Sequence, residues 1–92
     1  MVTWDEGKRQ LNSRSHGLDF LGCEEVFDGP VLAQEDDRES YGEQRVNLIG
    51  FLRGEIVFMT YTERGSDLHV ISLRKAKRHE IKAFSRWVSG QS

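Results

Sequence analysis

Three arginines stand in the part of the chain that is richest in strand-forming residues, and their side chains have the clearest chemical potential. Arg45, Arg64 and Arg74 lie at the ends of runs of Val, Ile, Phe, Tyr and Thr. A guanidinium group donates hydrogen bonds in a planar fork that fits two oxygens of a phosphate, and hydroxyl groups such as those of Thr62 and Ser72 add weaker donors. The group could therefore bind an anion. The alternative is that the arginines only solvate a sheet face and pair across strands.

Whether these arginines meet depends on the strands that carry them. We predict three antiparallel strands at residues 45–52, 55–62 and 68–74, because each run is rich in β-branched and aromatic residues and is bounded by a turn that contains glycine. A two-residue loop at 53–54 pairs Leu52 with Glu55 and Arg45 with Thr62.

The next loop decides which face the third strand presents. A three-residue loop at 65–67 pairs Arg64 with Leu68, Thr62 with Val70 and Thr60 with Ser72. Because successive side chains point to opposite faces of a sheet, the apolar face then holds Met59, Tyr61, Ile71 and Leu73, with His69 at its rim. The polar face holds Arg45, Asn47, Thr60, Thr62, Arg64, Ser72 and Arg74. We prefer this loop because a one-residue slip would turn Ser72 and Arg74 toward the core.

The flanking segments predict an α+β fold in one domain over residues 1–92, with two N-terminal helices, a four-stranded antiparallel sheet and a C-terminal helix. The first helix is capped at Thr3 or Asp5 and ends at His16, before Gly17. A second short helix runs from Asp19 to the Gly-Pro pair at 29–30. A fourth strand at 31–33 precedes the acidic, turn-prone segment 35–40. The last helix spans 76–88, and residues 1–4 form at most a short edge strand.

Composition restricts the class of protein. Among the 92 residues there is no apolar run near ~20 residues and no signal-peptide core, so we expect no membrane span. The one cysteine, Cys23, cannot form an internal disulfide, which favours the cytoplasm. Residues 1–63 hold 6 Lys/Arg against 13 Asp/Glu, whereas residues 64–92 hold 7 against 2. The basic C-terminal third could face a polyanion, and the acidic remainder a basic protein.

Metal sites and nucleophilic catalysis find little support in the sequence. The histidines and the cysteine that could bind a soft metal ion do not have the spacing of a zinc site; they are His16, Cys23, His69 and His79. We therefore expect neither a metal nor another cofactor. No nucleophile motif or glycine-rich phosphate loop is present.

General acid–base chemistry on RNA remains, because the ribose 2′-hydroxyl can attack its own phosphate without a metal. Arginines suit the task of stabilising charge on the phosphate oxygens. The proton acceptor is left open between Glu63, Lys75 and Glu80.

Motifs along nearly the whole chain resemble one family, the BrnT toxins of bacterial type II toxin–antitoxin systems. The matching segments are Trp4-Asp5, Lys8, Asn12, His16-Gly17, Asp19-Phe20, Val26-Phe27-Asp28, Asp37-Arg38, Gly42-Glu43-x-Arg45, Thr62-Glu63-Arg64-Gly65, Ile71-Ser72-x-Arg74-Lys75-Ala76, Arg78 and Glu80. Each segment is weak by itself, but their order and spacing are specific.

The resemblance implies a RelE-like fold and a metal-independent endoribonuclease that inhibits translation. It also implies neutralisation by a BrnA-like antitoxin with a ribbon-helix-helix domain, in a heterotetramer that meets operator DNA only through the antitoxin. A family member that binds the antitoxin or RNA without cutting is the alternative.

Individual roles follow from the same resemblance. Arg64 and Arg74 match the RNA-cleaving site, with Lys75 and Glu63 as further catalytic candidates. The residues expected to contact RNA are Arg45, Thr62, Ser72 and Arg78. Glu43 and Arg45 match a motif that fits a structural ion pair equally well. Residues expected to hold the first helix on the sheet are Trp4, Asp5, Lys8, Asn12 and His16. His69 stands where relatives often carry arginine.

Overall fold

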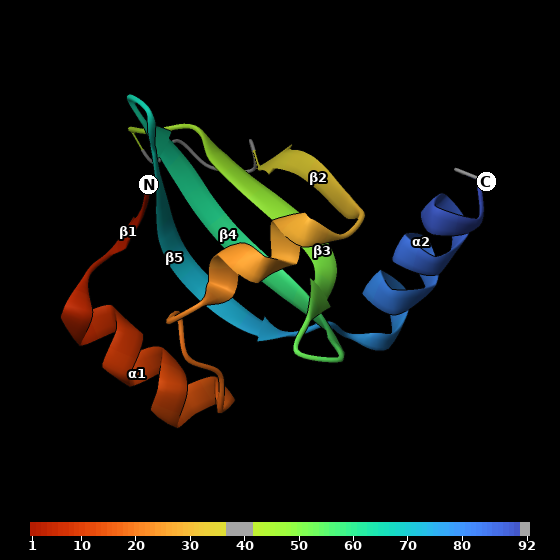
Figure 1. The fold of residues 1–92 in the computed structure, drawn as a ribbon, viewed down its shortest axis with the longest axis horizontal. Coiled ribbons are helices and arrows are strands. Elements are labelled where there is room, and N and C mark those ends of the chain that lie inside the picture. Colours follow the sequence, from red (N-terminus) through yellow and green to blue (C-terminus); the bar gives the residue numbers. More distant parts are fainter. Residues whose placement is uncertain (37–41, 91–92) are drawn as a thin grey trace.

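The protein is built on a mixed five-stranded sheet, seen here in a computed structural model that describes residues 1–36 and 42–90 (Figure 1). The strand order is β1-β5-β4-β3-β2, with β1 parallel to β5 and every other neighbouring pair antiparallel. In chain order the elements are β1 (Val2–Trp4), α1 (Glu6–His16), the 3-10 helix η1 (Cys23–Asp28), β2 (Val31–Asp36), β3 (Arg45–Leu52), β4 (Glu55–Arg64), β5 (Asp67–Lys75) and α2 (Arg78–Ser89).

The α+β class is confirmed, but the predicted arrangement was wrong in several details. The sheet has five strands because residues 2–4 pair in parallel with 68–70. The second N-terminal helix is a 3-10 helix. Strand β2 continues through Glu35 and Asp36, the first two residues of the predicted turn, and the rest of that turn lies outside the described residues. Helix α2 begins at Arg78, two residues later than expected.

Helix α1 is fixed at both ends and tied to the sheet at its centre. Asp5, not Thr3, is the N-cap, and its carboxylate accepts a hydrogen bond from the Lys8 amide at 3.0 Å. Gly17 ends the helix with φ 71°, a conformation that glycine adopts without strain. The Asn12 side chain forms two hydrogen bonds with the backbone of Leu73 in β5. The expectation that Asn12 holds the first helix on the sheet is therefore confirmed.

One face of the sheet carries the hydrophobic core, and η1 crosses that face (Figure 1). Phe20, Cys23 and Val26 are fully buried against strand residues such as Met59 and Leu73. Gly50 allows this close approach, because a Cβ atom at that position would come within 2.8 Å of a Val26 methyl group. The core thus lies between η1 and the β3–β4–β5 meander.

The first hairpin has the predicted register. Leu52 lies opposite Glu55, and Arg45 lies opposite Thr62. Arg53 and Gly54 form the two-residue loop, both with positive φ, as a tight hairpin turn requires.

The second hairpin has a shorter turn than predicted and a β-bulge further along β5. Arg64 lies opposite Asp67, which leaves a two-residue loop, and Thr62 lies opposite His69 rather than Val70. A bulge then restores the predicted pairing of Thr60 with Ser72. The bulge lets Val70 enter the core, fully buried, whereas the three-residue loop would have placed it on the polar face.

Two other predicted positions change as a result. Ile71, expected in the core face, is half-buried and lies with α1 residues around a small surface pocket. His69, expected at the rim of the apolar face, lies opposite Thr62 and Thr3.

Helix α2 packs on the end of β3 through its aromatic residues. Phe84 is buried and meets the ring of Phe51 edge-on, with ring centroids 5.2 Å apart. Ile81 of the predicted apolar stripe remains partly exposed. Within residues 1–36 and 42–90, no helix has the length and apolar character needed to cross a membrane.

Candidate active site

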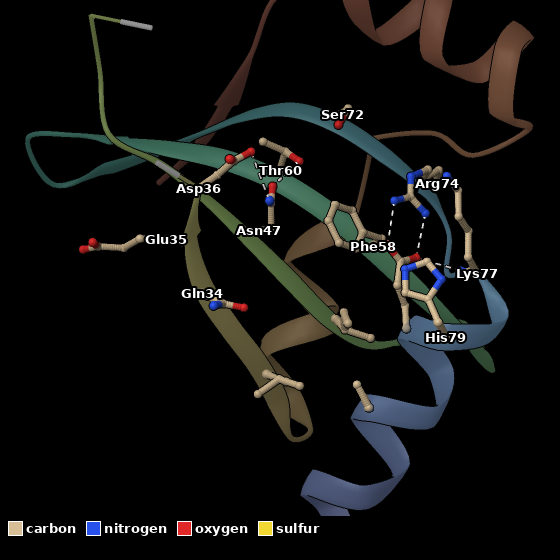
Figure 2. Close-up of a pocket in the computed structure, with 14 residues that line it drawn as sticks. Gln34, Glu35, Asp36, Asn47, Phe58, Thr60, Ser72, Arg74, Lys77 and His79 are labelled. Carbon is tan, nitrogen blue, oxygen red and sulfur yellow. Dashed lines mark hydrogen bonds and ion pairs between the residues drawn. The ribbon is translucent and has the colours of Figure 1, made fainter. Parts of the chain in front are cut away.

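The face of the sheet opposite the core carries a polar cleft between β2 and the start of α2 (Figure 2). Its volume is about 670 Å³. The polar residues that line it are Gln34, Glu35, Asp36, Asn47, Thr60, Ser72, Arg74, Lys77, His79 and Glu80, with Leu32, Ile49, Phe58 and Ala83 as apolar parts of the wall. Four of the seven residues predicted on the polar face are therefore gathered here.

Arg74 is the strongest hydrogen-bond donor of the cleft, and it is held rigidly. Its Nη1 and Nη2 atoms each lie 2.8 Å from a carboxylate oxygen of Glu80, and Nη1 also donates to the carbonyl of Lys75 at 3.2 Å. The guanidinium carbon lies 4.1 Å from the centre of the Phe58 ring. An ion pair and a cation–π contact thus fix the plane of the group.

This arrangement uses only part of the guanidinium. The Nε–H and the outer N–H of Nη2 share the other edge of the planar group, and neither has a partner among the described residues. That free edge can donate two parallel hydrogen bonds to a phosphate. The Arg74 side chain is 25% exposed, so an RNA backbone could reach the edge from solvent.

Glu80 serves to position Arg74. Besides the two bonds from Arg74, its carboxylate accepts a 2.7 Å hydrogen bond from the Lys77 amide. The Arg74 guanidinium lowers the pKa of Glu80, against the opposing effect of burial, and the Lys77 amide lowers it further. A carboxylate that is held ionised and already accepts three hydrogen bonds is a poor proton acceptor, so the geometry does not favour Glu80 as the base.

A chain of hydrogen bonds orders the floor of the cleft. The Thr60 hydroxyl donates to the Asn47 side-chain oxygen at 2.7 Å, and the Asn47 amide donates to a carboxylate oxygen of the buried Asp36 at 3.1 Å. These contacts connect β4, β3 and β2 across the sheet (Figure 2). The floor therefore presents fixed polar groups beside Arg74.

Arg64 lies at the far end of the same face and does not join Arg74. It forms a two-point ion pair with Glu43, with both N–O distances 2.9 Å. Arg74 lies opposite Phe58 on β4, and Arg64 is six residues further along that strand. At roughly 3.3 Å per strand residue, the two arginines are about 20 Å apart. They cannot bind the same phosphate.

The other polar residues near Arg64 belong to that far end. Thr62 is buried and donates to the carbonyl of Gln44 at 2.7 Å, and Arg45 lies opposite it on β3. The His69 Nδ1 atom lies 2.9 Å from the Thr3 hydroxyl. Burial lowers the pKa of His69, and the nearby Arg64 adds to the effect.

Three further predicted site residues also lie outside the cleft. Lys75 forms an exposed ion pair with Glu55 at 3.3 Å, at the end of β5. Glu63 is exposed and, by strand alternation, belongs to the side of the sheet that carries the core. Arg78 begins α2 and is exposed, but it is not part of the cleft wall.

Lys77 and His79 are among the cleft residues that the sequence did not predict as site residues. They enter the site because the chain turns at 76–77 and brings the start of α2 back beside Arg74. Short spacing from Arg74 in the sequence was the only signal. Among residues 1–36 and 42–90, no group of three or more His, Cys, Asp or Glu residues is placed to hold a metal ion.

Taken together, the fold and the site define a small α+β protein with an arginine-containing cleft suited to phosphate groups. Residues 4–80 match the sequence model of a family described as the ribonuclease toxin BrnT of type II toxin–antitoxin systems. The chain belongs to this family, which makes it a toxin with ribonuclease activity that has an antitoxin as its partner. A search of curated proteins found no match.

Proposed function

We propose that residues 1–92 act as one domain that cuts RNA internally, by attack of a ribose 2′-hydroxyl on the neighbouring phosphate, without a metal ion or other cofactor. The cleft between β2 and α2 would hold the scissile phosphate. The observation that carries this proposal is the free Nε–Nη2 edge of Arg74 at a polar cleft, while Glu80 holds the Nη1–Nη2 edge and Phe58 the plane of the group.

Arg74 supplies electrostatic stabilisation. Its Nε–H and outer Nη2–H donate to two non-bridging phosphate oxygens, where negative charge accumulates as the 2′-oxygen bonds to phosphorus. Because Glu80 already orients the guanidinium, little reorganisation is needed during the reaction. One preorganised donor of this kind contributes roughly 2.7–4 kcal/mol to catalysis.

The remaining predicted residues would position the RNA strand. Ser72 lies with Arg74 in the cleft, and Arg78 lies outside its wall, at the start of α2. On the same face, Arg64 lies about 20 Å from Arg74, and Thr62 and its partner Arg45 lie roughly 13 Å from it. There these residues would contact the strand a few nucleotides from the cut. Lys75 and Glu63 do not line the cleft, so the proposal gives them no proton-transfer role.

The cellular role follows from family membership. RNA cleavage in the cytoplasm would inhibit translation. A BrnA-like antitoxin with a ribbon-helix-helix domain would neutralise the toxin in a heterotetramer, and operator DNA would be contacted through that antitoxin. The match over residues 4–80 supports these assignments.

The decisive variant is Arg74→Lys, because lysine can still neutralise Glu80 but cannot donate two parallel hydrogen bonds to a phosphate. We expect the purified variant to cleave RNA about 100- to 1,000-fold more slowly than the wild-type chain in buffer with EDTA. Arg86→Lys on the exposed surface of α2 is the matched control and should retain full activity. Circular dichroism would verify that both variants are folded.

Two substrate results would complete the test. RNA with a 2′-deoxyribose at the cut position should resist cleavage, and normal RNA should yield a 2′,3′-cyclic phosphate. Cleavage by Arg74→Lys at the wild-type rate would overturn the site assignment. Loss of wild-type activity in EDTA, or cutting of the 2′-deoxy substrate, would overturn the mechanism.

A further inference from the structure

Attack by a 2′-hydroxyl requires a group that accepts its proton. The described residues around the cleft offer few such groups. Glu80 already accepts three hydrogen bonds, and the carboxylate of Asp36 is buried and accepts one from Asn47. The side chain of Glu35 points away from the cleft (Figure 2).

His79 is a possible proton acceptor that lines the same cleft as Arg74. It lies in the first turn of α2, is exposed, and lines the cleft with its ring close to Arg74 and Lys77 (Figure 2). Its neighbour Glu80 accepts two hydrogen bonds from Arg74 and one from the Lys77 amide at the start of the helix. The backbone at His79 is therefore fixed relative to the guanidinium of Arg74, while its imidazole stays accessible to a bound strand.

Imidazole also has the right chemistry. Among ordinary side chains, histidine is the one that gains and loses a proton in the neutral range, which suits a general base at cellular pH. Of the described residues that line the cleft, His79 is the only histidine.

We infer that His79 is the general base of the RNA-cutting reaction; this inference rests on the function proposed above. An imidazole nitrogen of His79 takes the proton of the 2′-hydroxyl as the 2′-oxygen forms its bond to phosphorus. The bond between phosphorus and the 5′-oxygen breaks, and its electron pair leaves with that oxygen. Water protonates the 5′-oxygen, and the resulting hydroxide removes the proton from His79. The products are a 2′,3′-cyclic phosphate and a 5′-hydroxyl.

Charged groups from three elements face this histidine. Arg74 on β5 and Lys77 before α2 carry positive charge. Glu80 on α2 and Asp36 on β2 carry negative charge at the same cleft. A general base acts only in its unprotonated form, so the fall of the cleavage rate at acidic pH (the acid limb) should depend on His79.

The test compares His79→Gln with the wild-type chain and with His16→Gln, which alters an exposed histidine of α1 outside the cleft. Cleavage rates of a short RNA are measured from pH 5 to pH 9. We expect His79→Gln to cut about 100- to 10,000-fold more slowly and to lose the acid limb, with His16→Gln unchanged. Binding of the 2′-deoxy RNA should stay within twofold of wild type, and added imidazole should partly restore cleavage by His79→Ala.

The outcomes separate the two proposals. A wild-type rate and an unchanged acid limb in His79→Gln would overturn the role of His79. If Arg74→Lys were still inactive in that case, the proposed function would stand. The role of His79 as a base would also be overturned if His79→Gln lost RNA binding as much as cleavage rate and imidazole did not rescue His79→Ala. In that case His79 would only contact the RNA. No cleavage by the wild-type chain would overturn both proposals.

Discussion

The Asn12 side chain replaces a missing strand partner, and its removal should destabilise the fold strongly. Strand β1 pairs with only three residues of β5, at 68–70, and beyond them the outer edge of β5 has no strand neighbour among residues 1–36 and 42–90. Asn12 fills that gap: its amide nitrogen donates to the Leu73 carbonyl at 2.7 Å, and its oxygen accepts from the Leu73 amide at 3.1 Å. The same nitrogen also donates to the Leu18 carbonyl at 2.9 Å.

The expected loss of stability follows from the backbone groups that lose their hydrogen-bond partner. In Asn12→Ala the amide and carbonyl of Leu73 lose these partners in a buried environment, while Leu18 keeps a long contact from Ser13 at 3.4 Å. Each buried polar group without a partner costs about 1–3 kcal/mol, so we expect a loss of roughly 2–5 kcal/mol in the free energy of unfolding. A chain of this length has a total of roughly 5–14 kcal/mol, so the loss is a large fraction.

Urea denaturation of Asn12→Ala measures this loss, with Gln10→Ala as the control on the exposed side of the same helix. Hydrogen exchange gives a local readout, because the Leu73 amide should exchange faster in Asn12→Ala and not in Gln10→Ala. Asn12→Asp should be no more stable than Asn12→Ala, since a second carboxylate oxygen would face the Leu73 carbonyl. A loss below about 0.5 kcal/mol for Asn12→Ala would refute the reasoning, because exposed substitutions reach that size.

Two further predictions use the ionisable groups. Because Arg74 lowers the pKa of Glu80 below its ordinary value of 4.5, the ion pair stabilises the fold above that pH and loses its effect as acid protonates the carboxylate. The stability difference between wild type and Glu80→Gln should therefore be constant above about pH 5 and shrink below pH 4.5, and a difference that does not change with pH in urea titrations would contradict it. Burial raises the pKa of the Cys23 thiol to about 11, so a disulfide reagent at pH 8 should label the folded chain only as fast as it unfolds. Fast labelling in native buffer, at the rate seen in concentrated urea, would show that the thiol is accessible.

The features that the sequence predicted correctly are those set by local patterns. The first hairpin follows from a two-residue turn and from two strands whose apolar and polar residues alternate so that like residues share a face. Asn47, Thr60, Ser72 and Arg74 were placed on the polar face by the same alternation, and the cleft confirms that placement.

The missed features depend on contacts between distant parts of the chain. Strand β1 has three residues, too few for a pattern, and its partner lies more than sixty positions away. The entry of His79 into the cleft depends on the direction that α2 takes after the turn at 76–77, which no periodicity encodes. Arg64 and Arg74 share a face, as predicted, but alternation says nothing about the distance between them along it.

The second hairpin shows why a correct face can come from a wrong register. To bring Arg64 and Ser72 to the same face, β5 needs one extra residue, in the turn or in a bulge. From Ser72 onward, the side chains point to the same faces in both cases. The two arrangements differ for residues 67–71, and Val70 decides between them because it is fully buried opposite Tyr61. Val70→Thr should therefore cost about 1–3 kcal/mol in unfolding free energy, since it buries a hydroxyl in the core. Ile71→Thr, at the half-buried bulge position, should cost less. Urea denaturation with Val70→Thr as stable as wild type would instead place Val70 on the polar face and the extra residue in the turn.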